Sequence, residues 1–101
     1  MATNTKELFA GFMQQLMIQQ LKEFKSFLKL YKSKDEEIDK IYESGFEPTE
    51  KQAREFAKLK IEYEEFMQYF KLNDFNLFES KDYNWTPLVV AEELVKETFG
   101  N

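Results

Sequence analysis

The sequence contains no cysteine and no histidine, and it has only three glycines and two prolines among 101 residues. Without cysteine there are no disulfides and no thiolate metal sites. Without histidine there are no histidine-based catalytic triads and no histidine-ligated metals. Scarce glycine and proline, together with abundant Lys, Glu, Gln, Leu and Phe, favour helices over strands and turns.

Long apolar runs are also missing. No segment approaches the roughly 20 apolar residues that span a bilayer. The first 20 residues are interrupted by polar stretches and lack the apolar core of a secretion signal. We therefore expect a cytoplasmic protein that does not contact a membrane.

The hydrophobic content is nevertheless 43%, and 11 of the residues are phenylalanine. A chain of this length buries roughly two thirds of its unfolded surface, which is enough for one core. We predict a single domain covering residues 1–101, because the length suits one domain and the sequence shows no internal repeat or low-complexity segment.

Apolar residues predict a long first helix over residues 5–32. They recur at steps of three and four from Phe9 to Tyr31, which is the helical period. Ser33 and Glu36 then have the spacing of a capping box, which predicts a short helix over 34–44 that ends at Gly45. Whether this helix is separate or a kinked continuation of the first is left open by the pattern.

The clearest helix is predicted over residues 50–71. Thr49 and Gln52 form another capping box, and an apolar stripe runs from Phe56 to Phe70. Ala53, Ala57 and Met67 are expected to widen this stripe.

Residues 72–86 are predicted to form an aromatic-rich loop. Thr86 and Pro87 then predict the start of a last helix over residues 87–98, with Thr86 as the N-cap. The fold class is therefore all-α, a small helical bundle of two long helices, over 5–32 and 50–71, and shorter ones.

The net charge of −5 conceals a strong segregation. Residues 1–34 carry six basic and two acidic groups, whereas residues 35–50 carry one basic and seven acidic groups. The acidic segment, represented by Glu36, Glu37 and Glu43, has two interpretations. It is the solvated face of a capped helix, or it mimics phosphates and occupies a basic nucleic-acid groove on another protein.

Four lysines at helical spacing form a basic stripe beside the apolar face of the first helix. They predict either a solvated flank or weak nucleic-acid binding, and the single arginine makes the latter the less favoured alternative. The four are Lys22, Lys25, Lys29 and Lys32.

Some apolar residues lie too far from the centre of their stripe for one core to bury them. On a helical wheel, Leu8 and Phe12 lie roughly 100–140° to one side of the first stripe, and Ile18 lies about as far to the other. They predict an interface with a partner protein or a second copy of the chain, or else cover by the loop and the last helix. Tyr83 and Trp85 in the loop are further candidates, as interface anchors or as core.

Nothing in the sequence points to catalysis, a cofactor or a metal. There is no glycine-rich phosphate loop and no nucleophile motif, and Glu62, Glu64 and Glu65 are interpreted as a polar helix face. We predict a non-enzymatic protein-binding protein, an adaptor, assembly factor or inhibitor that forms a homodimer. The alternatives are an acidic inhibitor of a nucleic-acid-handling protein, such as a phage anti-defence factor, and weak nucleic-acid binding through the lysine stripe.

Overall fold

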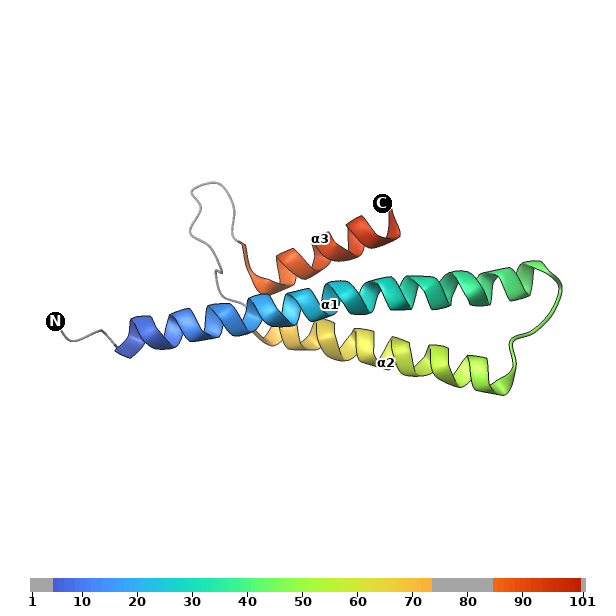
Figure 1. Cartoon of the computed structure of the whole chain (residues 1–101), viewed down its shortest axis with the longest axis horizontal. Coiled ribbons are helices and arrows are strands. Elements are labelled where there is room, and N and C mark those ends of the chain that lie inside the picture. Colours follow the sequence, from blue (N-terminus) through green and yellow to red (C-terminus); the bar gives the residue numbers. More distant parts are fainter. Residues whose placement is uncertain (1–4, 74–84, 101) are drawn as a thin grey trace.

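The computed structural model describes residues 5–73 and 85–100. For residues 5–10 it describes the backbone alone, and side chains are described from residue 11 onward. Three helices make up this part of the chain: α1 (Thr5–Glu43), α2 (Glu50–Leu72) and α3 (Pro87–Phe99). Figure 1 shows α1 as the central element, with α2 running back along it and α3 packed on another side. The all-α fold class is thereby confirmed for the described residues. Of the aromatic-rich loop predicted over 72–86, residues 74–84 lie outside them.

The segments predicted over 5–32 and 34–44 are one continuous helix, so of the two alternatives left open the separate short helix is wrong. Ser33 lies inside α1 and does not cap a second helix. No glycine or proline interrupts this stretch, and ion pairs of Lys32 with Glu36 and of Lys34 with Glu37 stabilise the helix across the expected break. The buried Ile38 continues the apolar stripe past this point.

The C-terminus of α1 was predicted correctly at Gly45. This residue has a φ of +82°, in the left-handed region that glycine adopts without strain. The N–H of Gly45 donates to the carbonyl of Tyr42 and the N–H of Phe46 donates to that of Ile41, which is the Schellman arrangement. The side chain of Phe46 remains 71% exposed.

The predicted N-caps of α2 and α3 are both present. The hydroxyl of Thr49 accepts from the N–H of Gln52, and the Gln52 side chain accepts in return from the N–H of Thr49, which completes the capping box. Thr86 accepts from the N–H of Val89 ahead of Pro87. Both helices extend one residue beyond their predicted C-terminal ends.

The core is a cluster of aromatic rings around Phe24, which is fully buried. Its ring centroid lies 5.1 Å from that of Phe66 and 5.3 Å from that of Phe70, both on α2. Tyr31 extends the cluster, because its ring meets Tyr63 at 5.5 Å and Phe99 of α3 at 5.9 Å, both nearly perpendicular. Edge-to-face pairs of this kind add to the stabilisation from apolar burial.

The molecule is elongated. Its principal extents are 68 × 28 × 18 Å and its radius of gyration is 17.8 Å, whereas a compact chain of this length has about 13 Å. Figure 1 shows the cause: the N-terminal part of α1, in dark blue, extends past the ends of α2 and α3. In the described part of the chain, the buried residues of α1 begin only at Met17.

Candidate functional site

The projecting end of α1 carries the first group of predicted binding residues. Phe12 lies about two turns from the start of the helix and is 65% exposed. Ile18 is partly covered, so the structure does not place it with Phe12 on one open face. Leu8 belongs to α1, but its side chain lies outside the described residues. Of the two predicted residues whose side chains the structure describes, Phe12 is the one that presents a large apolar surface to solvent.

The predicted acidic residues are partly neutralised by their neighbours. Glu36 lies 3.9 Å from the ammonium of Lys32, and Glu37 lies 3.1 Å from that of Lys34. Glu36 and Glu43 share one helix face because they are seven residues apart, whereas Glu37 points about 100° away from Glu36. The three glutamates therefore do not form a single acidic patch.

Lys34 joins the two long helices at this end of the molecule. Its Nζ lies 2.7 Å from Oε2 of Glu55, which sequence reasoning did not single out. Hydrogen bonds to Glu55 and to Glu37 raise the pKa of Lys34 above its usual value. The hydrogen bond from Lys34 lowers the pKa of Glu55 in turn.

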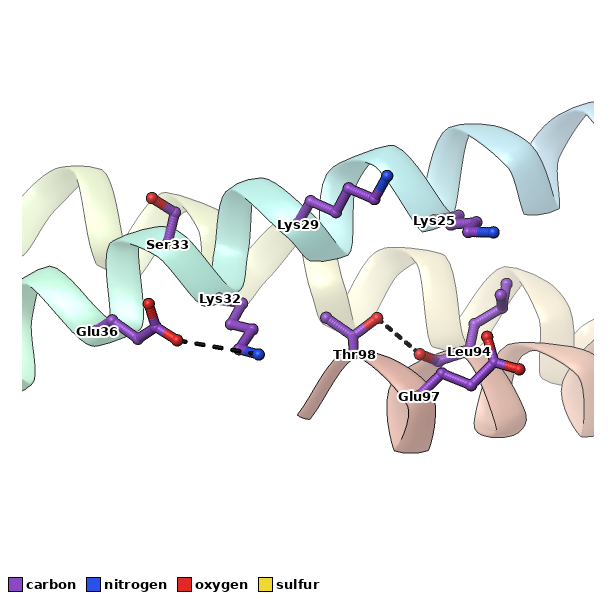
Figure 2. Close-up of a pocket in the computed structure, with 8 residues that line it drawn as sticks. All are labelled: Lys25, Lys29, Lys32, Ser33, Glu36, Leu94, Glu97 and Thr98. Carbon is purple, nitrogen blue, oxygen red and sulfur yellow. Dashed lines mark hydrogen bonds and ion pairs between the residues drawn. The ribbon is translucent and has the colours of Figure 1, made fainter. Parts of the chain in front are cut away.

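The lysine stripe borders a shallow groove of about 460 Å³ between α1 and α3. Figure 2 shows Lys25, Lys29 and Lys32 on one side of this groove and residues of α3 on the other. Two carboxylates, those of Glu36 and Glu97, also line it, so the three lysines give it a net charge of only +1. Because the lining contains both signs of charge, this groove attracts a phosphate backbone more weakly than the lysine stripe alone would.

Of the two predicted aromatic residues in the loop, the structure describes Trp85. Trp85 is partly buried just before α3. Tyr83 lies outside the described residues. The prediction that both are interface anchors stays a prediction.

Several exposed apolar residues were missed by sequence reasoning. Leu30 is 59% exposed, Ile61 57% and Leu72 73%. Ala53 and Ala57 are also exposed, although they were expected to widen the core stripe of α2. The wheel position of Ile61 carried the signal, because it lies opposite the aromatic stripe of its own helix.

None of the residues that the structure describes forms a cluster of three or more acidic side chains able to hold a metal ion. None of the described helices is both long and apolar enough to cross a bilayer. No protein-family model, curated protein or solved structure matches this chain. The functional argument therefore depends on the surfaces of the three helices.

Proposed function

We propose that this is a small non-enzymatic protein-binding protein, an adaptor, assembly factor or inhibitor, that acts through the projecting end of α1. The observation that carries the proposal is the 65% exposure of Phe12 on a helix end that neither α2 nor α3 reaches. Helical segments of this kind bind by laying an apolar face into a groove on a partner.

The side chains around Phe12 support this use. Met13 and Leu16 follow it on α1 and are themselves only partly covered. Methionine adapts its shape to different apolar surfaces and is common where a protein binds a partner. A large aromatic side chain beside such residues is a suitable anchor for an interface.

The proposal is tested by capturing partners of the tagged protein from its native host and identifying them by mass spectrometry. Phe12→Asp should remove the specific partner while circular dichroism shows unchanged helix content. Leu30→Asp is the matched control, because Leu30 is similarly exposed and lies about 27 Å further along α1. Equal capture by the wild type and by Phe12→Asp contradicts the proposal.

A second candidate is an acidic inhibitor of a nucleic-acid-handling protein, such as a phage anti-defence factor. The observation that favours it is the exposure of Glu43, Glu47 and Glu50 at or beside the turn between α1 and α2, one tip of the molecule. Negative charge at a tip would complement a basic groove on the target. Replacing Glu43, Glu47 and Glu50 by Lys should then abolish target binding while circular dichroism shows unchanged helix content, and retained binding rejects this candidate.

A further inference from the structure

The outer face of α2 is covered by no other element among the described residues. The inner face of α2 is marked by Phe56, Tyr63 and Phe70, which recur every seven residues. Their rings contact aromatic rings of α1 in the core. Ile61 lies two residues from Tyr63, which places it about 160° around the helix from that face. Its side chain is 57% exposed, so an apolar residue stands at the centre of the outer face.

Ile61 is also the midpoint of α2, since Glu50 and Leu72 are each eleven residues away from it. Residues 50–60 contain four basic and two acidic side chains, a net charge of +2. Residues 61–72 contain one basic and three acidic side chains, a net charge of −2. The charges on the helix are therefore opposite in sign on the two sides of the exposed isoleucine.

The exposed charges nearest Ile61 on the outer face follow the same division, because Lys58 precedes it and Glu64 and Glu65 follow it, so this face is complementary to itself. If two copies of α2 pair antiparallel about a two-fold axis at Ile61, the basic half of each helix lies against the acidic half of the other. With the axis at Ile61, a residue of one copy faces the residue of the other copy that lies about as far on the opposite side of Ile61. Lys58 of one copy then faces Glu65 of the other, and Lys60 faces Glu64. The two-fold axis forms each pair twice, as an isologous interface requires.

The neighbouring side chains are suited to this approach. Ala57 is small and exposed one turn before Ile61, so it allows the two helix backbones to come close. A shallow, open depression beside Ile61 is lined by Glu64, Glu65, Gln68 and Leu72. Side chains from the basic half of a second copy would lie over this depression.

The charged groups near the axis are available for such contacts. Within the described ranges, Lys58, Glu64 and Glu65 form no ion pair. Lys60 lies 4.8 Å from the ring centroid of Phe56, so its ammonium is already engaged in a cation–π contact. The pair of Lys58 with Glu65 is therefore the better one to test.

We propose that the protein forms an antiparallel homodimer through the outer face of α2, with the two-fold axis at Ile61. This inference goes beyond the proposed function and is independent of it, because it uses a different helix from the projecting end of α1. Both faces are able to be occupied at once, since α1 and α2 present them at different places on the molecule.

The test is the molecular mass of the full chain in solution, measured by light scattering at tens to hundreds of micromolar. The wild type should show a dimer, and Ile61→Asp should show a monomer because it places two carboxylates face to face at the axis. Leu30→Asp on α1 is the matched control and should remain a dimer. Circular dichroism checks that each variant keeps its helix content.

Charge exchange makes the test specific for the orientation of the helices. Lys58→Glu alone and Glu65→Lys alone should each weaken dimerisation by roughly tenfold, because each places like charges together twice. The double variant Lys58→Glu with Glu65→Lys should recover the wild-type dissociation constant. This arm remains decisive even if Ile61→Asp does not fold.

Three results overturn the inference. They are a wild-type monomer at every concentration, a dimer that persists in folded Ile61→Asp, and a double charge variant that stays as weak as its parents. None of them contradicts the proposed function, whose capture experiment depends on Phe12. Conversely, a dimer confirmed on α2 leaves that capture experiment to decide the role of α1.

Discussion

The ammonium of Lys34 lies 2.7 Å from the carboxylate of Glu55, and this ion pair links α1 to α2 across 21 residues of sequence. The side chain of Lys34 is only 15% exposed, whereas that of Glu55 is 47% exposed. The same ammonium also contacts Glu37 on α1. The contact therefore joins the N-terminal half of α2 to α1 close to the point where a separate short helix was one of the predicted alternatives.

We expect Glu55→Gln to lower the free energy of unfolding slightly at neutral pH. In acid, the difference between this variant and the wild type should disappear. The pKa of Glu55 is lower in the folded protein than its usual value of 4.5. A lowered carboxyl pKa stabilises the fold above the unfolded value, and this stabilisation disappears as the pH falls through the folded value. Urea unfolding of both proteins, at pH 7 and at pH values below 4.5, measures the difference.

Glu23→Gln is the matched control for this experiment. Glu23 is exposed on α1 and forms no ion pair with another residue that the structure describes. Its replacement should change the free energy of unfolding little at either pH. A difference between Glu55→Gln and the wild type that persists unchanged in acid contradicts the assigned role of the ion pair.

Local sequence signals predicted the ends of the helices well. The capping box at Thr49, the proline after Thr86 and the glycine at position 45 each mark a helix end in the structure. These signals work because they concern backbone groups within one turn of the residue itself. The same reasoning failed at Ser33, because a capping pattern inside a helix is not used when the helix can continue through it.

A second prediction concerns the core. Phe24→Ala should lower the free energy of unfolding by about 3–5 kcal/mol, because it leaves a cavity beneath α2. Phe24 is fully buried and its ring contacts several others, among them Phe66 and Phe70. Phe12→Ala removes the same side chain from an exposed site and should change stability by less than about 0.5 kcal/mol. Urea unfolding followed by circular dichroism compares the two, and equal losses contradict the assignment of the core.

The surface was harder to predict than the helix ends. The sequence placed Phe12 outside the core correctly, since it lies far from the centre of its own stripe. The wheel position of Ile61, opposite the aromatic stripe of α2, indicated its exposure, but a helical pattern alone does not say which neighbours cover each face. Which face of a helix is covered depends on how the three helices pack. That packing is made by contacts between segments distant in sequence, which a local pattern does not contain.

A third prediction compares two glycines. Gly45→Ala should destabilise the fold by about 1–2 kcal/mol, because the residue has a φ of +82°. Gly11→Ala should instead stabilise it by about 0.5–1 kcal/mol, since position 11 is inside α1 and alanine is the better helix former. Apart from the chain neighbours and the local helix backbone, no described atom lies within 4 Å of a Cβ added at either glycine, so a steric clash does not contribute to the difference. Thermal unfolding of both variants measures the change in the midpoint temperature. A change in the same direction for both contradicts the assigned backbone conformations.

The last prediction tests the continuity of α1 through Ser33. In a continuous helix this exposed serine has no capping role, so Ser33→Ala should stabilise the protein by about 0.5 kcal/mol through helix propensity. If Ser33 instead capped a separate helix, the same substitution would cost about 1 kcal/mol. Thr49→Ala is the matched control, because Thr49 caps α2 and its loss should cost about 1 kcal/mol. Both free energies come from urea unfolding, and a loss at Ser33 equal to that at Thr49 would show that the helix breaks there in solution.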